Sequence, residues 1–499
     1  RVGKDDVTYP IKFVPEGSSI SKKGVGNKGY NTESIQWTVD FNKDRETIEN
    51  AVLNDEITEG DHVFKEGSLK VYELHINADG TVDEEKTVEI SDHGFGDSFP
   101  LQLETIDSAY RVVYETEVND RVGTSYKNKA TLDGGNIDPV SAEASVDVGR
   151  GEALAKGVDD YDDVAQKVRW EVKYNYDEKI ISQEQAKLTD KFDARMELIT
   201  ESIEIFKVEI DPETGKEAEK SVIDSDRYKV TPTDDGFELQ FNKGIDSAYK
   251  IYYETKATKR VIDGFDANNT ISDEFENVRE GGQFISQGVF IKSHDGNPDY
   301  DKKETSWTIL INRDEQVMED VAFSDTLPKG MSPENVMVTH GGESLTQGED
   351  ADYTYFYNED TRKIEIRFLN DITERVYITY DTPIDFDEVD LEDVSFTNNA
   401  QLEWIPENET DKITKTGTAV FDPDEYTQQN GFKGASYNPS TKEITWTIGV
   451  NYNKATLENV IVEDFIIGDQ NFNIDNVKVY EMNLTGEAYG YEFGNEITD

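Results

Sequence analysis

The stretch 35–42 reads Ile-Gln-Trp-Thr-Val-Asp-Phe-Asn, with apolar residues at every second position and an Asn five residues after the Trp. This alternation is typical of a β-strand with one buried face. The same Trp-to-Asn spacing recurs three more times in the chain. The four pairs are Trp37 and Asn42, Trp170 and Asn175, Trp307 and Asn312, and Trp446 and Asn451. A recurring unit of this kind predicts tandem domains rather than one large core.

A tyrosine-rich strand follows each of the first three Trp strands. It covers 109–116 (Ala-Tyr-Arg-Val-Val-Tyr-Glu-Thr), 248–255 (Ala-Tyr-Lys-Ile-Tyr-Tyr-Glu-Thr) and 375–382 (Arg-Val-Tyr-Ile-Thr-Tyr-Asp-Thr). We interpret its aromatic side chains as core and edge packing. Many short alternating strands, turn sequences between them and almost no helical periodicity predict an all-β fold, with tandem immunoglobulin-like β-sandwich domains in an elongated array.

The repeats also set the expected domain boundaries. We expect residues 1–15 to be the end of a preceding repeat or a linker, residues 16–148, 149–283 and 284–421 to form three complete sandwiches, and residues 422–499 to form a partial fourth repeat. The fourth copy ends before the Tyr-rich and Asn strands, so it cannot complete a sandwich from these residues alone.

The composition limits the partners and the location of the chain. Acidic residues outnumber basic residues by 106 to 50, which gives a formal charge of −56 and predicts repulsion from nucleic acids and anionic membranes. The absence of Cys excludes disulfides, thiol catalysis and thiolate metal sites from this stretch. No apolar run is long enough to cross a bilayer. We therefore expect no membrane insertion in this segment.

A Lys, an Asp and an Asn recur with constant spacing. The two clearest sets are Lys22, Asp55 and Asn128, and Lys292, Asp325 and Asn398. In both sets the Asp follows the Lys by 33 residues and the Asn follows it by 106. Lys23 competes with Lys22, and the identical spacings decide for Lys22. Strand alternation places the Lys and the Asn of each set on the apolar face.

Such a set can form an amide bond between two side chains. Burial lowers the pKa of a Lys and raises that of an Asp, so a neutral amine and a neutral carboxylic acid can coexist in an apolar core. The fold supplies proximity, and the Asp can polarise the Asn carbonyl and transfer protons while ammonia leaves. We therefore predict Lys–Asn isopeptide bonds, with Asp55, Asp190 and Asp325 as assisting acids.

The second and fourth copies fit this pattern less closely. Lys156 and Asp190 are 34 residues apart, and Asn268 and Asn269 are both eligible as the second partner. An Asn followed by one residue and then a small residue favours Asn268, which lies 112 residues after Lys156. In the fourth copy we predict Lys433 as the crosslinking Lys and Asp464 as the assisting acid, and the Asn strand is not among these residues.

These motifs together resemble the collagen-binding-domain repeats of Gram-positive surface adhesins. The resemblance is carried by residues 20–24 (Ile-Ser-Lys-Lys-Gly), the Trp strand, Asp55, residues 110–116 and residues 128–130 (Asn-Lys-Ala). It implies modified immunoglobulin-like sandwiches, often with Asp-assisted Lys–Asn isopeptide bonds, and an extracellular matrix partner such as collagen. It also implies an extracellular location at the cell surface, with covalent cell-wall attachment through a region outside this segment. Two departures stand out, because the third copy has Lys292-Ser-His and the second lacks the Asn-x-Ala pattern.

Two functions remain open from the sequence. The chain is either an adhesin that contacts extracellular matrix, or a stalk or fibre segment that projects a distal adhesive domain. Turnover catalysis is not expected, because no nucleophile elbow or phosphate loop is present and the five His are scattered. No cofactor and no metal site are predicted; residues 77–83 are more simply a hairpin turn than a Ca²⁺ loop.

Overall fold

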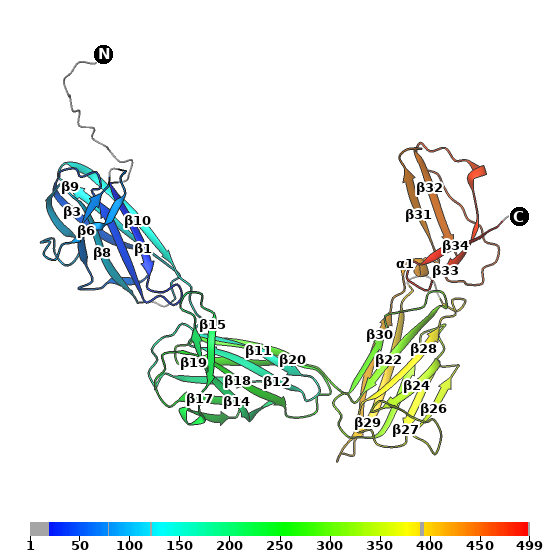
Figure 1. Cartoon of the computed structure of the whole chain (residues 1–499). Helices are drawn as coiled ribbons and strands as arrows, with labels where there is room; N and C mark the ends of the chain where they lie inside the picture. Colours follow the sequence, from blue (N-terminus) through cyan, green and yellow to red (C-terminus); the bar gives the residue numbers. More distant parts are fainter. Residues whose placement is uncertain (1–18, 78, 120–121, 390–393, 498–499) are drawn as a thin grey trace. The chain divides into compact units, whose positions relative to one another are not determined.

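The computed structural model describes residues 19–77, 79–119, 122–389 and 394–497, and almost all of its regular structure is β-strand. The chain forms two compact units. One consists of Arg1–Asp160, Val168–Thr255 and Ala267–Gln283, and the other of Tyr161–Lys167, Lys256–Asp266 and Phe284–Asp499. Within the described ranges, no helix has the length and apolar character needed to cross a membrane. The expected all-β class of tandem immunoglobulin-like sandwiches is confirmed (Figure 1).

The first sandwich consists of two antiparallel sheets. One sheet has the order β1 (Ile20–Gly26), β2 (Ser34–Phe41), β8 (Ala109–Val118), β5 (Lys70–Ile76) and β6 (Val82–Glu89), with β4 (His62–Phe64) also paired to β8. The other sheet has the order β10 (Ile137–Asp147), β9 (Ser125–Gly134), β3 (Ile48–Glu59) and β7 (Leu101–Ile106). Apolar side chains from both sheets meet in one buried core between them.

The second sandwich repeats this arrangement. Its first sheet has the order β11 (Leu154–Asp162), β12 (Lys167–Tyr174), β18 (Ala248–Ala257), β14 (Met196–Ile210) and β15 (Glu217–Val222). Its second sheet has the order β16 (Tyr228–Thr233), β17 (Gly236–Phe241), β13 (Lys187–Phe192), β19 (Phe265–Asp273) and β20 (Val278–Ile285), and the short 3-10 helix η1 (Ser225–Arg227) precedes β16. The Lys, Trp and Tyr strands therefore share one sheet, and the Asp and Asn strands share the other.

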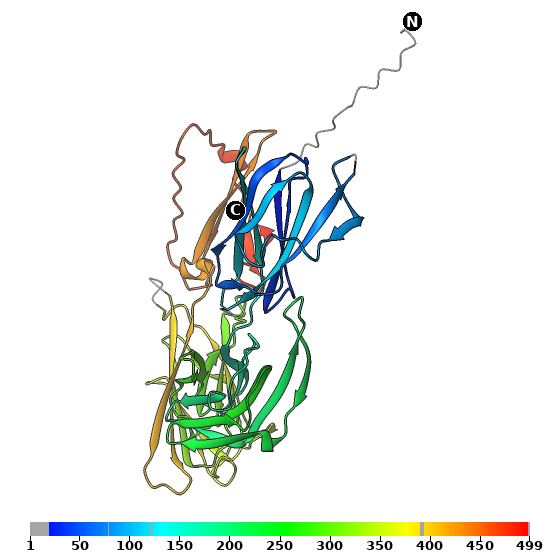
Figure 2. The same ribbon diagram turned by 90° about the vertical axis from the view of Figure 1, so that its left-hand side faces the viewer.

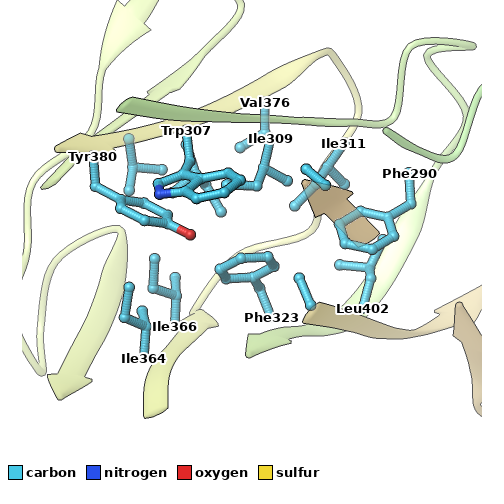
Figure 3. Close-up of a cluster of buried hydrophobic side chains, with 14 of the residues drawn as sticks. Phe290, Trp307, Ile309, Ile311, Phe323, Ile364, Ile366, Val376, Tyr380 and Leu402 are labelled. Carbon is cyan, nitrogen blue, oxygen red and sulfur yellow. The ribbon is translucent and has the colours of Figure 1, made fainter. Parts of the chain in front are cut away.

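The third sandwich has the same strand order as the second. Its first sheet contains β21 (Phe290–His294), β22 (Glu304–Ile311), β28 (Val376–Pro383), β24 (Glu334–His340) and β25 (Glu343–Ser344). Its second sheet contains β26 (Tyr353–Asn358), β27 (Lys363–Phe368), β23 (Met318–Thr326), β29 (Phe396–Pro406) and β30 (Ile413–Phe421). Figure 3 shows the core between these sheets, where the ring of Tyr380 lies beside Trp307 and its hydroxyl points into the apolar interior.

The remaining residues form two separate hairpins rather than a sandwich. After the short helix α1 (Glu425–Gln428), β31 (Gly431–Asn438) pairs with β32 (Glu443–Val450), and after η2 (Ile474–Asn476), β33 (Tyr480–Leu484) pairs with β34 (Tyr491–Glu496). The segment between β32 and η2 runs without strand partners (Figures 1 and 2). As a result Trp446 is 46% exposed, whereas Trp37, Trp170 and Trp307 are fully buried.

The Asn that follows each Trp by five residues turns the chain at the end of the Trp strand. Asn42, Asn175, Asn312 and Asn451 have φ angles of 52°, 58°, 60° and 58°. Asn accepts this left-handed conformation more readily than most residues because its short amide can bond to nearby backbone. The Asn42 amide, for example, donates to the Glu46 and Ser108 carbonyls at 2.9 and 3.0 Å. This Asn therefore joins the end of the Trp strand to the start of the Tyr strand.

Candidate functional site

The repeated Lys lies on the outermost strand of the first sheet, next to the Trp strand. Lys22 is paired with Val39 and Lys292 with Ile309, so both point into the sandwich together with apolar neighbours. The Asp comes from the facing sheet. The Lys and Asp side chains are 0% and 6% exposed in the first copy and 0% exposed in the other two. Each of the three sandwiches thus encloses the side chains of one such Lys and one such Asp between its two sheets.

In the first sandwich the Lys lies between an Asp and a Tyr. Lys22 Nζ donates to Asp55 Oδ2 at 2.5 Å and to the Tyr114 hydroxyl at 2.6 Å. Asn128 Nδ2 donates to the same hydroxyl at 3.1 Å. The structure therefore brings together all three residues predicted for this copy, and it selects Lys22 over Lys23.

The second sandwich contains the same cluster with one change of residue. Lys156 Nζ donates to Asp190 Oδ2 at 2.6 Å and also to the Tyr253 hydroxyl. That hydroxyl donates to Asp190 Oδ2 at 2.6 Å and accepts from Asn269 Nδ2 at 2.8 Å. Asn269 is fully buried, whereas Asn268 is exposed on the opposite face of β19.

The prediction that Asn268, rather than Asn269, lies in the buried cluster was therefore wrong. The strand register gives the physical reason, because Asp55 pairs with Ala130, Asp325 with Ala400 and Asp190 with Ile271. In every copy the residue opposite the Asp lies two positions after the inward-facing Asn. Counted back from Ile271, that position is Asn269.

The third sandwich repeats the arrangement. Lys292 Nζ donates to Asp325 Oδ2 and, at 3.1 Å, to the Tyr380 hydroxyl. The hydroxyl donates to Asp325 Oδ2 and accepts from Asn398 Nδ2 at 2.9 Å. The predicted Lys292, Asp325 and Asn398 therefore meet in one buried cluster. His294 stands where the first copy has a Gly, and its ring stacks on Phe421.

Tyr114, Tyr253 and Tyr380 are the site residues that sequence reasoning missed. Their sequence pattern predicts packing alone, yet each hydroxyl contacts both the Lys and the Asn of its cluster. The sequence did hold a signal, since each of these residues begins a triplet of Tyr, an acidic residue and Thr in the Tyr strand.

The Thr of that triplet holds the Trp that covers the Lys. The indole nitrogens of Trp37, Trp170 and Trp307 donate to Thr116, Thr255 and Thr382 at 2.9, 2.9 and 3.0 Å. The Lys nitrogens lie 5.3, 5.2 and 5.5 Å from the centres of the same Trp rings. The Trp therefore shields the amine from water while its own polar group is satisfied.

Burial changes the acid–base properties of the cluster. It lowers the pKa of Lys22, Lys156 and Lys292, although the neighbouring Asp acts against this change. Burial also raises the pKa of Asp190 and Asp325, against the opposing effect of the Lys. Both changes favour transfer of a proton from the Lys to the Asp, which leaves a neutral amine beside a neutral acid.

Several buried oxygens of the site, the Asn carbonyls among them, lack a hydrogen-bond donor. In the part of the chain that the structure describes, Oδ1 of Asn128, Asn269 and Asn398 is buried without a hydrogen-bond partner. Oδ1 of Asp190 and of Asp325 is in the same condition. Buried oxygens without donors are unfavourable, and a proton carried by the carboxyl is a donor that such oxygens lack. The site thus contains an amine, an amide and an acid in a dry environment.

The fourth copy has only part of the cluster. Lys433 Nζ lies 2.5 Å from Asp464 Oδ1 and 4.7 Å from the centre of the Trp446 ring. The two side chains are 41% and 35% exposed, so water screens the pair.

Across the described residues, no group of three or more His, Cys, Asp or Glu side chains is placed to hold a metal ion.

A sequence model of the collagen-binding domain family matches residues 17–143, 155–280 and 428–498. These segments make up more than half of the chain, and they include the first two complete clusters and the partial fourth. The third sandwich lies outside the matched segments although it carries the same cluster. A search among curated proteins finds no significant match.

Solved structures resemble the chain over part of its length. The collagen adhesin CNA from S. aureus is 14% identical, covering 60% of this chain and 94% of its own, with a TM-score of 0.21. The C-terminal domain of the Streptococcus agalactiae AgI/II polypeptide BspA is 13% identical, covering 54% and 100%, with a TM-score of 0.22. Enterococcus faecalis ACE is 10% identical, covering 52% and 92%, with a TM-score of 0.20. These structural similarities are too weak to show a family, and the match to the sequence model is the evidence for one.

Proposed function

The chain belongs to the collagen-binding domain family, and we propose that it is a segment of a surface adhesin whose sandwiches crosslink themselves through Lys–Asn isopeptide bonds. The bonds join Lys22 to Asn128, Lys156 to Asn269 and Lys292 to Asn398. The segments 16–148, 149–283 and 284–421 are the corresponding domains, each with one bond between its two sheets.

One observation carries the proposal, namely the same buried cluster in three sandwiches. A buried ion pair is weak evidence for stability, because replacing it with apolar residues is often neutral or stabilising. Three copies of a Lys, an Asp and an Asn around a Tyr hydroxyl are better explained by chemistry than by packing. The Asn carbonyls without donors support the same interpretation.

The reaction would occur once in each folded domain. The neutral Lys amine attacks Cγ of the Asn, the new N–C bond forms, and the bond from Cγ to Nδ2 breaks. The protonated Asp donates to the Asn oxygen while negative charge develops there, and recovers its proton when the carbonyl forms again. The Lys nitrogen loses one proton and Nδ2 gains one, so ammonia leaves and no other reactant is consumed.

The mass of the intact, denatured protein tests the crosslinks. We expect the full chain to be lighter than its sequence by three ammonia molecules. Asp55→Ala, Asp190→Ala and Asp325→Ala should each restore one of them. Asp193→Ala is the matched control, because Asp193 lies just after β13 and pairs with exposed Arg195 outside the cluster. A wild-type mass equal to that of the plain sequence would refute the crosslinks.

The adhesive role requires its own test, since a crosslinked stalk would contain the same bonds. We propose an extracellular location and a matrix partner of the collagen type, which the family assignment supports. The full chain should bind immobilised fibrillar collagen saturably at physiological ionic strength. Binding seen only at low salt would indicate nonspecific attraction to this acidic chain. Absence of saturable binding would favour the alternative, a stalk that projects a distal adhesive domain.

A further inference from the structure

We propose that Tyr114, Tyr253 and Tyr380 are catalytic residues of the crosslinking reaction, which relay a proton from the attacking Lys nitrogen to the departing Asn nitrogen. The inference rests on the proposed isopeptide chemistry and assigns the step by which ammonia leaves. It concerns the phenolic oxygen alone, because the aromatic rings are also part of the core.

The first support is that each hydroxyl contacts both nitrogens that change their bonds. In the first sandwich the Tyr114 oxygen lies 2.6 Å from Lys22 Nζ and 3.1 Å from Asn128 Nδ2. In the third, Tyr380 lies 3.1 and 2.9 Å from the corresponding atoms of Lys292 and Asn398. The second sandwich has the same two contacts. One oxygen therefore bridges the nucleophile and the leaving group in all three copies.

The second support is the change that attack makes in the Asn nitrogen. In the carboxamide Nδ2 is a donor only, because its electron pair is delocalised into the carbonyl. When the Lys nitrogen adds to Cγ, the delocalisation ends and Nδ2 gains a free electron pair. The contact between Nδ2 and the Tyr hydroxyl can then reverse, with the hydroxyl donating its proton to Nδ2.

The relay conserves atoms and charge. After the attack the Lys nitrogen carries two protons and a positive charge. One of these protons passes to the Tyr oxygen while the phenolic proton passes to Nδ2. The electron pair of the bond from Cγ to Nδ2 then leaves with the nitrogen as ammonia. The Tyr ends with one proton, as it began, and the Asp retains its role at the carbonyl oxygen.

A neutral phenol suits this task. Burial raises the pKa of Tyr114, Tyr253 and Tyr380 above the ordinary value, and the nearby Asp adds to the increase. The hydroxyl consequently stays protonated, and it donates to Asp Oδ2 in the second and third sandwiches. It can exchange one proton for another, but it cannot act as a phenolate base.

Tyr252 shows how different an ordinary hydroxyl of the same strand is. It precedes Tyr253 in β18, so its side chain lies on the opposite face, where its hydroxyl donates to Glu171 at 2.9 Å. The Tyr252 hydroxyl is not among the groups that contact Lys156 and Asn269 in the cluster. Tyr252→Phe is therefore a matched control for Tyr253→Phe, because both changes remove one hydroxyl from the same strand.

The test follows ammonia loss with time in the full chain. Freshly purified Tyr253→Phe is incubated at neutral pH, and its intact mass is measured at intervals. We expect crosslinking of the second sandwich to be slowed by about 100-fold or more, the effect of losing a proton-transfer group. The first and third sandwiches should react fully and serve as internal standards. Tyr252→Phe should match the wild type.

A background that cannot react separates chemistry from packing. Lys156→Met blocks the second bond, so comparing Lys156→Met with Lys156→Met/Tyr253→Phe shows what the hydroxyl contributes to folding alone. We expect similar hydrogen-exchange protection of β12 and β18 in the two proteins. A large loss of protection would mean that the slow reaction reflects a damaged fold, and would contradict the relay. Tyr114→Phe and Tyr380→Phe repeat the measurement in the other two sandwiches.

The outcomes distinguish this inference from its premise. If the wild type lacks three ammonia molecules and the Tyr→Phe variants react as fast as it does, the relay is refuted while the crosslinks stand. If the wild type has the mass of the plain sequence, the proposed chemistry fails, and the relay fails with it.

Discussion

The buried Lys is the residue on which the proposed chemistry depends. In Lys156 and Asp190 both side chains are completely shielded, so the charged form of either group is penalised by the loss of water. Removing one partner of a buried ion pair typically costs about 3–5 kcal/mol, because the other charge is left uncompensated. Conversion of the amine to an amide would remove the ionisable amine, and the proton that the Lys had given up would leave the Asp neutral. The crosslink would thus resolve an unfavourable arrangement that the fold itself imposes.

Two neighbouring Asn residues provide a sharp test at this scale. Asn269→Ala should abolish one of the three ammonia losses, because Asn269 is the amide inside the second cluster. Asn268→Ala should leave all three, because Asn268 is exposed. Intact mass distinguishes the two variants directly. The opposite pattern would show that the register of β19 differs from the structure.

The pKa of Asp190 predicts how stability changes with pH when the bond cannot form. Burial raises this pKa above the ordinary value of 3.8. The stabilisation associated with Asp190 is therefore fully present below pH 3.8 and is lost as the pH rises through the folded-state pKa. Asn269→Ala should accordingly lose stability, relative to Asn269→Ala/Asp190→Asn, as the pH rises from acid toward neutral.

Urea unfolding of these two variants at several pH values measures that difference. Because Asp190 cannot titrate in the double variant, acidic groups distant from the cluster contribute equally to both and cancel to a first approximation. A difference that grows in favour of Asn269→Ala with rising pH would mean that the folded-state pKa of Asp190 is lowered, and would contradict the proposed neutral acid.

At the scale of elements, the Trp and Tyr strands act together as the wall of the site. They are adjacent in the first sheet, and Trp37 pairs with Tyr114 as Trp307 pairs with Tyr380. The bond from the indole to the Thr two residues after the Tyr fixes this wall. Strand alternation then places the Trp, the Tyr and the Thr on the same buried face.

Loss of the hydrogen bond between the Trp and the Thr should destabilise the pairing of the Trp and Tyr strands. Thr255→Val keeps the shape of the side chain but leaves the Trp170 N–H buried without an acceptor, which should cost about 1–3 kcal/mol. Hydrogen exchange measured by mass spectrometry should show weaker protection of β12 and β18. Thr231→Val, at an exposed position of β16 in the same sandwich, should change protection little. Equal effects of the two changes would contradict a special role for this bond.

Much of the arrangement of strands and cluster residues could be predicted from the sequence. The Trp motif predicted the strands and their buried face, and the spacings of 33 and 106 predicted the Lys, Asp and Asn of two clusters. Asn268 was chosen over Asn269 because the pattern of following residues was used in place of the register with Asp190. The role of the Tyr hydroxyls could not be predicted, since a buried aromatic residue has the same sequence pattern whether or not its hydroxyl contacts the Lys.

At the scale of the whole molecule, each sandwich carries its own complete site. The chain has a charge of −56, no Cys and therefore no disulfides to strengthen its domains. Internal amide bonds would provide that strength independently in each domain. They would also determine how the chain responds to force, since the residues between the two bonded side chains cannot be extended.

Single-molecule stretching should show this directly. In the wild type the 112 residues between Lys156 and Asn269 (157 to 268) remain shielded by the bond. In Asp190→Ala they should become extensible, adding up to about 370–410 Å at full extension. Asp193→Ala should give the wild-type extension. Equal extensions of wild type and Asp190→Ala would show that no bond shields the second sandwich.

The most direct measurement is peptide mapping of the denatured, protease-digested protein by tandem mass spectrometry. We expect three branched peptides, in which Lys22 is joined to Asn128, Lys156 to Asn269 and Lys292 to Asn398, each with the loss of one ammonia. Linear peptides alone, cleaved normally after these three lysines, would contradict the proposed self-crosslinking.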